Sequence, residues 1–217
     1  TIPILKKKVV PVRLDFINVP EGFPVGQLSF HISNEEIEVA GPAEAIDRYK
    51  EIPLGQIDLR TLDIGMTESF AVELPTGFVN TQNIQSVLVQ LNSEGMVSKN
   101  FNVSTILINN VPLNYQATAT TQEIPNVKVV GPQSIVENLV AGDIVATVDL
   151  EESSSIASGQ IELPVKISIP KKGLVWASGS YKAIISIAEQ NGSQTTTEDE
   201  TEQPQEPQSE PTEQQTE

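Results

Sequence analysis

The chain has 217 residues, no cysteine and a formal net charge of −16. The lack of cysteine excludes disulfides, thiolate metal sites and cysteine nucleophiles. No run of 18 apolar residues occurs, so no transmembrane helix is predicted in the printed chain. The chain has 29 Asp or Glu residues against 13 Lys or Arg. This excess of acidic residues argues against a nucleic-acid partner, because the phosphates of a nucleic acid need a basic face.

A basic cluster, Lys6, Lys7 and Lys8, stands in the first segment. We interpret it as a solvated strand edge, where lysines discourage pairing with a second sheet. Contact with lipid or a partner is the alternative. The charges follow a very short apolar run, the reverse of the order in a signal peptide, and the chain does not begin with Met. We therefore expect an upstream part that carries any export or anchor segment.

The turn "NVPEGF" at Asn18–Phe23 returns 92 positions later as "NVPLNY" at Asn110–Tyr115. Three further motif pairs follow in the same order, at offsets of 90 to 96: "IEVAGP" with "VKVVGP", "IDL" with "VDL", and "FAVELPTGF" with "VKISIPKKGL". Four motifs in register predict a duplicated domain. We place the two domains at residues 6–98 and 99–190, and the sheet to which the strand Phe101–Ile108 belongs stays open.

The dominant period within each half is two, which is typical of half-buried strands. Pro164 interrupts one such run and predicts a sheet edge or a bulge there, because proline donates no ladder hydrogen bond. Each half has one helical signal after a Gly-Pro pair, over residues 42–49 and 132–139, with the proline suited to the first helical position. The chain is therefore predicted to be mainly β, with two tandem homologous domains that each hold one short helix.

Residues 191–217 have no aromatic, aliphatic or basic side chain, and eight of the 29 acids lie there. Such a segment cannot bury enough apolar surface to offset the entropy of ordering it, which predicts a disordered acidic tail. The remaining 21 acids against 13 bases give residues 1–190 a net charge of about −8.

The repeated order of motifs resembles the YbbR-domain family: a strand ending in a "VPxGY"-like turn, "VxGP" before a short helix, "VDL", and an alternating strand ending in "PxG". The resemblance covers residues 6–189. The second copy departs from it with Asn114 where the pattern prefers Gly, although Asn also tolerates positive φ. Members of this family are typically bacterial, have several β-rich domains outside the cell behind one N-terminal transmembrane helix, and bind and regulate a membrane-bound diadenylate cyclase.

Groups that could perform chemistry are few. His31 is the only histidine and is predicted to face solvent. The acid pairs Glu35-Glu36 and Glu151-Glu152 stand at turn signals, and adjacent strand residues face opposite ways, so neither pair predicts an acid/base dyad. Asp58 and Asp149 occupy matching places, which favours a turn or capping role. We expect no catalytic residue, no metal site, no cofactor and no enzymatic activity.

The aromatic residues Phe23, Tyr115, Phe78 and Trp176 remain as candidates for contact with a partner. Core packing is the expectation for Phe23 and Tyr115. Trp176, the only tryptophan, stands between glycines in a segment predicted as an exposed loop, and tryptophan is enriched at binding hot spots. We therefore predict a partner contact at Trp176, and expect Trp176→Ala to weaken binding while leaving the fold intact.

The resemblance implies a non-enzymatic module on the outer face of the bacterial plasma membrane, held by an upstream transmembrane helix. Its implied function is to bind a membrane-bound diadenylate cyclase and modulate cyclic di-AMP synthesis, and envelope or cell-wall components are further candidate partners. The alternative is a bacterial surface or cell-wall binding module with an adhesive role. Carbohydrate binders usually present a row of exposed aromatic side chains, which one Trp and three Tyr can hardly supply.

Overall fold

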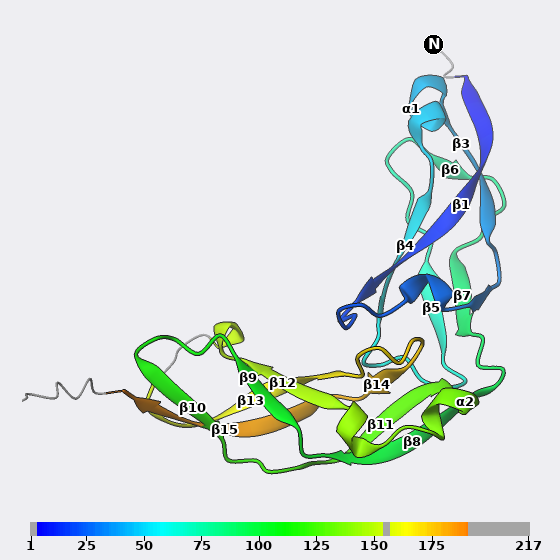
Figure 1. Cartoon of the computed structure of the whole chain (residues 1–217). Helices are drawn as coiled ribbons and strands as arrows, with labels where there is room; N and C mark the ends of the chain where they lie inside the picture. The colour runs from blue at the N-terminus through cyan, green and yellow to red at the C-terminus, as the bar shows by residue number, and fades with distance from the viewer. Residues whose placement is uncertain (1–3, 154–156, 191–217) are drawn as a thin grey trace, which may run out of the picture.

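The computed structural model describes residues 4–153 and 157–190. The predicted acidic tail, residues 191–217, lies outside the described residues and stays a prediction. The described chain is mainly β, as predicted, and forms an elbow with one repeat in each arm (Figure 1).

The first repeat is built on two sheets with strand orders β4-β1-β3-β6 and β2-β7-β5. The long strand β1 joins the parts of the repeat, because its first half pairs antiparallel with β3 and its second half pairs parallel with β4. The elements are β1 (Leu5–Ile17), η1 (Val25–Gln27), β2 (Phe30–Ile32), β3 (Glu36–Pro42), α1 (Ala43–Arg48), β4 (Ile52–Asp58), β5 (Thr67–Ala71), β6 (Val79–Asn80) and β7 (Ser86–Leu91).

The second repeat follows the same plan, with strand orders β14-β11-β8 and β10-β15-β13-β12-β9. Two strands replace β1: β8 pairs antiparallel with β11, and β9 pairs parallel with β12. The elements are β8 (Met96–Val103), β9 (Ile106–Asn109), β10 (Tyr115–Ala119), β11 (Ile124–Pro132), α2 (Gln133–Val136), η2 (Ala141–Asp143), β12 (Val145–Asp149), η3 (Leu150–Glu152), β13 (Gly159–Ser168), β14 (Trp176–Ser178) and β15 (Tyr181–Glu189). The predicted duplication is therefore visible strand by strand.

The chain crosses between the repeats in the short segment after β7, which ends at Leu91. Strand β8 begins at Met96 and pairs with β11 from Met96 to Val103. The segment Phe101–Ile108 therefore belongs to the second repeat, through the end of β8 and the start of β9. The predicted boundary between residues 98 and 99 falls inside β8.

Each repeat encloses its own apolar core, and the predicted alternation decides which side chains enter it. In β13, Leu163, Val165 and Ile167 are buried while Glu162, Lys166 and Pro164 are exposed. Proline is tolerated at position 164 because the strand is an edge there: β15 pairs with it on one side, and β12 reaches only residues 166–168 on the other. This prediction is confirmed.

The two helices are shorter than the predicted ranges. Pro42 and Pro132 precede the helices as their N-cap residues, so they do not occupy the first helical position. Helix α1 ends before Tyr49, which is already extended toward β4. Ile46 and Val136 are fully buried against the sheets, which is the packing that stabilises helices of this length.

Candidate functional site

The side chains that could perform chemistry are dispersed. His31 is exposed on β2, as predicted, and Glu35 and Glu36 are exposed where β3 begins. Glu152, also exposed, forms an ion pair with Lys166. Over residues 4–153 and 157–190, no group of three or more His, Cys, Asp or Glu side chains could hold a metal ion. Within the same residues, no helix is long and apolar enough to cross a membrane.

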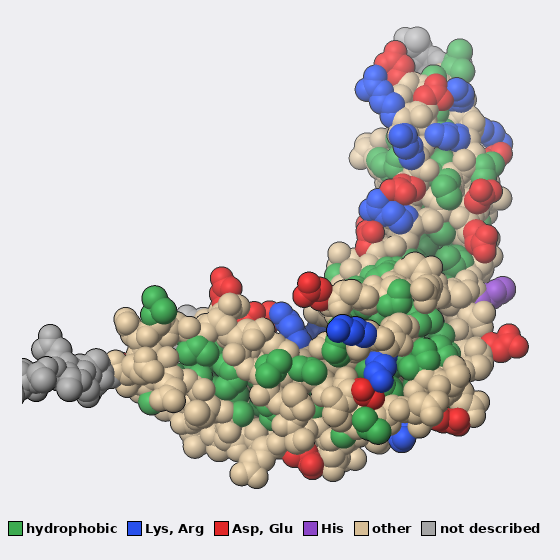
Figure 2. Space-filling view, in the orientation of Figure 1, with side chains coloured by type: hydrophobic (Ala, Val, Ile, Leu, Met, Phe, Trp, Pro, Cys, Tyr) green, Lys and Arg blue, Asp and Glu red, His purple; other side chains and the backbone are tan. Residues whose placement is uncertain are grey.

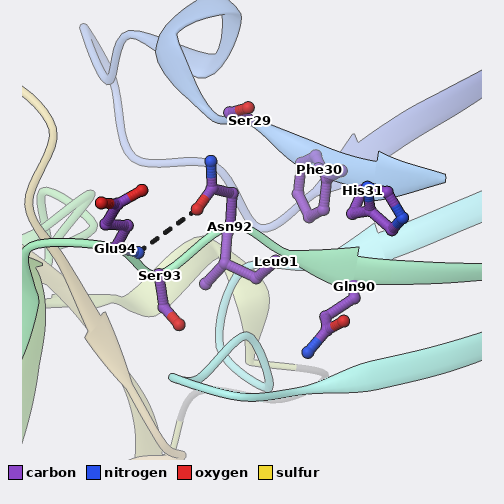
Figure 3. Close-up of a pocket in the computed structure, with 8 residues that line it drawn as sticks. All are labelled: Ser29, Phe30, His31, Gln90, Leu91, Asn92, Ser93 and Glu94. Atoms are coloured by element: carbon purple, nitrogen blue, oxygen red, sulfur yellow. Dashed lines mark hydrogen bonds between the residues drawn. The ribbon is translucent and has the colours of Figure 1, made fainter.

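A shallow hollow of about 480 Å³ lies where β2 meets the end of β7 (Figure 3). Its lining comes from residues 29–31 and 90–94 and is largely polar. The backbone N–H of Glu94 donates to Asn92 Oδ1 at 3.3 Å and closes the turn at its rim. His31 and Glu94 are its only titratable side chains, and no hydrogen bond joins them. This hollow therefore presents no arrangement for catalysis.

The residue proposed from the sequence for partner contact, Trp176, does not lie in an exposed loop. It begins β14, is only 1% exposed, and donates its indole N–H to the Leu62 carbonyl oxygen at 2.9 Å. The Phe23 ring meets it edge-on, with 6.1 Å between the ring centroids. The expectation of an exposed Trp176 is wrong because the first repeat covers this side chain. A contact between Trp176 and a partner stays untested.

The polar contacts between the two repeats come from one corner of the first repeat, residues 58–63. The Arg60 carbonyl oxygen accepts hydrogen bonds from the Gly179 N–H at 2.7 Å and from Ser178 Oγ at 3.4 Å. At the other end of this corner, Asp63 forms an ion pair with Lys128 of β11. The corner of the first repeat therefore lies against the end of the edge strand β14 and accepts from the Gly179 N–H directly after it.

An apolar contact underlies these hydrogen bonds. Leu59 and Leu62 are 1% exposed, and Val130 of β11 is fully buried. Val130 and Trp176 pack within the core of the first repeat, although both belong to strands of the second. The two repeats therefore share one apolar cluster and form a single packed unit at the elbow. We call this contact the junction. It is defined by residues 58–63 and Phe23 of the first repeat and by Lys128, Val130, Trp176, Ser178 and Gly179 of the second.

The repeated turn and the repeated aspartate are connected in each copy. Asn110 Nδ2 donates to Asp149 Oδ1 at 2.8 Å, and in the first repeat the Asn18 side chain likewise bonds Asp58. Asn18 and Asn110 have φ values of 55° and 56°, in the left-handed region that asparagine tolerates. The turn sequence therefore recurs because, in each repeat, a left-handed asparagine connects the turn to the equivalent aspartate.

The predicted turn and capping role of the two aspartates is confirmed. Asp58 Oδ1 accepts the Arg60 N–H at 2.9 Å, and Asp149 Oδ1 accepts the Glu151 N–H at 3.0 Å. Asn114, which stands where the first repeat has Gly22, does not adopt the positive φ of that glycine. Gly22 has φ +75°, whereas Asn114 is not among the described residues with positive φ.

Hydrogen bonds lower the pKa of both aspartates below their ordinary value of 3.8. For Asp58 the main cause is the Arg60 guanidinium, and for Asp149 it is the Asn110 amide. A carboxyl with a lowered folded-state pKa stabilises the fold above its unfolded pKa, and this contribution is lost as the pH falls through the folded-state value.

We therefore expect the free energy of unfolding to fall as the pH is lowered below about 3.8, and to fall less steeply in an Asp58→Asn, Asp149→Asn double variant. Urea denaturation at a series of pH values measures this. Glu38 and Asp143 also have lowered pKa values, so the slope should shrink without vanishing. Parallel curves for the two proteins would contradict the assignment.

A groove of about 640 Å³ follows the inner side of the elbow (Figure 2). Residues 18–21 and Arg60 form its wall on the first repeat, and β12, β13 and β14 form its floor on the second. Its lining is about equally polar and apolar, and its charged side chains are largely paired, Arg60 with Asp58 and Lys166 with Glu152. The groove is a concave surface lined by both repeats, but its lining brings no set of reactive side chains together.

The basic cluster lies on the first half of β1, which pairs with β3 on one side only, in agreement with a strand edge. Lys6 pairs with Asp47 at 2.6 Å and Lys7 with Glu38 at 3.0 Å. Lys8 donates to the carbonyl oxygens of Ile46 at 3.3 Å and Tyr49 at 2.8 Å, at the C-terminal end of α1. The cluster therefore stabilises its own repeat. The alternative, contact with lipid or a partner, stays untested.

Sequence reasoning missed the junction residues Leu62, Asp63, Lys128 and Val130. Their apolar or charged character fits an ordinary core or surface position, and only the pairing of two distant segments gives them their role. One signal was available: "LRTLD" after the repeated aspartate has no counterpart in "LEESS", although the preceding "IDL" and "VDL" agree.

No family model matches the chain, and no curated protein matches it. Solved structures do. A YbbR-like protein from Streptococcus pneumoniae is 14% identical with a TM-score of 0.32, over 86% of this chain and 96% of that one. The YbbR-like domain of the lmo2119 protein from Listeria monocytogenes is 16% identical with a TM-score of 0.32, over 45% of this chain and 98% of that one.

The protein SuR18C from Streptococcus thermophilus is 16% identical with a TM-score of 0.31, over 40% of this chain and 84% of that one. YbbR-like proteins are therefore among the solved structures to which this chain is similar. Identities this low concern the fold alone.

Proposed function

We propose that this chain is a non-enzymatic extracytoplasmic part of a membrane-anchored regulator that binds and modulates a diadenylate cyclase. The proposal rests on the resemblance of the repeated motifs to YbbR domains. That resemblance implies binding and regulation of a membrane-bound diadenylate cyclase. On this proposal the chain lies on the outer face of the bacterial plasma membrane, behind an upstream transmembrane helix.

The junction is the structural observation that supports the proposal. A regulator must transmit a difference in contacts from one place to another, because an effector shifts an equilibrium only by its differential affinity for two states. If a flexible linker joined the two repeats, each would rotate independently, and a change in the contacts of one repeat would not reach the other. Here Leu62, Val130 and Trp176 are buried in one cluster, so a contact made by one repeat can move the other as part of the same unit.

The lack of exposed aromatic side chains on the described surface favours this role over the adhesive alternative. The six Phe, three Tyr and one Trp of the chain all lie within the described residues, and none of them is classed as exposed. A protein that binds wall carbohydrate by stacking sugar rings on aromatic faces would need several exposed rings. Envelope or cell-wall components remain candidate partners through polar contacts.

The test is expression of the full-length polypeptide with a membrane diadenylate cyclase, with cyclic di-AMP and co-purification as the two measurements. We expect the nucleotide level to change and the cyclase to co-purify. A variant with an exposed substitution away from the junction, Leu88→Asp, is the control and should behave like the parent, since Leu88 is 50% exposed on β7.

A junction variant, Trp176→Ala, separates binding from regulation. We expect it to reduce the change in cyclic di-AMP more than it reduces co-purification, because it loosens the coupling between repeats. Unchanged nucleotide levels together with no co-purification of the cyclase would contradict the proposed function.

A further inference from the structure

Strand β8 forms one edge of the sheet β14-β11-β8. It pairs with β11 from Met96 to Val103, and no other strand of the described chain pairs with its outer side. The first repeat contacts the opposite edge, where its Arg60 carbonyl oxygen accepts from Ser178 and Gly179 (Figure 1). With eight residues, β8 is the longest edge strand among the described residues. Its outer side therefore presents backbone groups that have no partner strand.

A tyrosine shows which backbone groups of β11 point away from β8. The Lys128 N–H donates to Tyr181 Oη at 2.8 Å, and this hydroxyl donates to the Ser178 carbonyl oxygen at 2.7 Å. Lys128 lies opposite Ser178 of β14, so its N–H points toward β14. On the β8 side, just past the end of β11, the Gln133 N–H donates to the Gly95 carbonyl oxygen at 2.9 Å. Between residues 127 and 132, even-numbered positions therefore direct their backbone groups to β14, and odd-numbered positions direct theirs to β8.

The same alternation decides which backbone groups of β8 are free. Val129 directs its backbone groups to β8 and lies opposite Lys99, so the N–H and C=O of Lys99 point inward to β11. Ser98, Asn100 and Asn102 therefore direct their N–H and C=O groups outward, at intervals of about 7 Å along the strand. Outside the ladder, no backbone group of the described chain bonds to them. Their side chains are exposed, so the outer edge of β8 is accessible.

The equivalent edge of the first repeat is blocked. The first half of β1 pairs with β3 in the register in which β8 pairs with β11, so residues 6–8 correspond to residues 97–99. Residues 6–8 are all lysine, and Pro11 follows them on the same strand. Lysine and proline on an edge both oppose the addition of another strand. Strand β8 has no proline and keeps a single lysine, Lys99, so it is the edge suited to accept an added strand.

Lys99 indicates which side chain an added strand would carry. It is exposed, its Nζ lies 4.9 Å from the centroid of the Phe101 ring, and it takes part in none of the ion pairs between described residues. Opposite charges on neighbouring strands stabilise their pairing, and like charges oppose it. A second β8 strand would bring another lysine to this edge. An acidic segment therefore fits better than a second copy of this chain.

We propose that β8 binds an extended segment of a partner polypeptide, which joins the sheet β14-β11-β8 as a fourth strand and places an acidic side chain beside Lys99. The outward N–H and C=O groups of Ser98, Asn100 and Asn102 would bond the backbone of that segment. In strand addition of this kind, the main-chain hydrogen bonds supply affinity and the alternate side chains supply specificity. The inference does not depend on the proposed function, because the edge would accept such a segment from any partner.

Nuclear magnetic resonance of the 15N-labelled chain tests the proposal. The probe is a short peptide of alternating threonine and valine with one central glutamate, acetylated and amidated at its ends. As this peptide is titrated to millimolar concentration, we expect the amide signals of Ser98, Asn100 and Asn102 to shift and their hydrogen exchange to slow. The same peptide with lysine in place of glutamate should give smaller shifts.

Two substitutions at one position separate the backbone from the side chain. Asn100→Pro removes an outward N–H without removing a bond to β11, because proline is tolerated on an edge strand where its nitrogen faces solvent. It should abolish the shifts. Asn100→Ala removes the same side chain, keeps the N–H, and should bind the glutamate peptide like the parent. The spectrum of each variant also reports whether it folds.

The charge of Lys99 supplies a second test that does not depend on proline. Lys99→Glu should reverse the order of the two peptides, so that the lysine peptide gives the larger shifts. Unshifted signals of Ser98, Asn100 and Asn102 in the parent chain would overturn the proposal, as would equal binding to Asn100→Pro and Asn100→Ala. Shifts at these amides that grow with the concentration of the chain alone would assign the edge to a second copy and overturn the partner segment.

Discussion

Replacing Trp176 with alanine is expected to lower the free energy of unfolding by about 3–5 kcal/mol, the usual cost of truncating a large buried aromatic side chain. The expected structural effect is that the two repeats lose their fixed arrangement. Trp176 is 1% exposed, packs edge-on against Phe23, and donates to the Leu62 carbonyl oxygen. Alanine removes the ring, the hydrogen bond and the shared contact with the first repeat together.

Urea denaturation and small-angle X-ray scattering measure the two effects. Phe101→Ala is the control, because Phe101 is 8% exposed and packs in the core of the second repeat, away from the junction. Both variants should lose stability, but only Trp176→Ala should broaden the scattering envelope of the elbow. Trp176→Phe should cost less, about 1 kcal/mol for the lost hydrogen bond plus a packing change. Equal scattering of Trp176→Ala and Phe101→Ala would contradict the role of Trp176 at the junction.

Replacing Gly131 with alanine is expected to destabilise the chain by about 1–3 kcal/mol through overpacking. A Cβ at this position would lie 2.8 Å from the Leu174 carbonyl oxygen and 3.0 Å from Val175 Cγ2. The first of these atoms belongs to the backbone of the segment before β14, which cannot move without shifting Trp176. The substitution should therefore strain the strand pair that supports the junction.

Two further glycines supply matched controls for urea denaturation. At Gly41, the counterpart of Gly131, the three atoms nearest to a Cβ would belong to the Phe78 ring, at 3.0–3.3 Å, and a ring can move aside. At Gly142 a Cβ would meet nothing within 4 Å. The expected order of destabilisation is Gly131, then Gly41, then Gly142. A larger loss at Gly41 than at Gly131 would show that the backbone before β14 adapts more easily than this packing implies.

Much of the fold could be predicted from the sequence because it depends on short-range patterns. The alternation of apolar and polar residues along β13, the proline at its edge and the paired "VxGP" motifs are local signals, and the structure agrees with them. Helix length was overestimated, because the apolar stripe continues after the helix ends. Tyr49 and Leu139 keep apolar contacts beyond the last turns of α1 and α2.

The junction could not be predicted because it depends on residues far apart in the chain. Trp176 and its acceptor Leu62 are separated by 114 positions. The glycines around Trp176 indicated a loop, and nothing nearby indicated a partner in the other repeat. A gapless alignment of "GLVW" at 173–176 with "GFVN" at 77–80 sets Trp176 against Asn80, whereas the strand register sets it against Val79. That one-residue shift concealed an apolar position present in both copies.

The most direct test of the rigid elbow is a distance measured between its two arms. The chain has no cysteine, so nitroxide labels can be attached uniquely at Glu44→Cys on α1 and Thr118→Cys on β10, both of which are exposed. Double electron–electron resonance should give one narrow distance distribution in the otherwise unchanged chain and a broad one after Trp176→Ala. A broad distribution before that substitution would contradict the claim that the junction holds the two repeats as one unit.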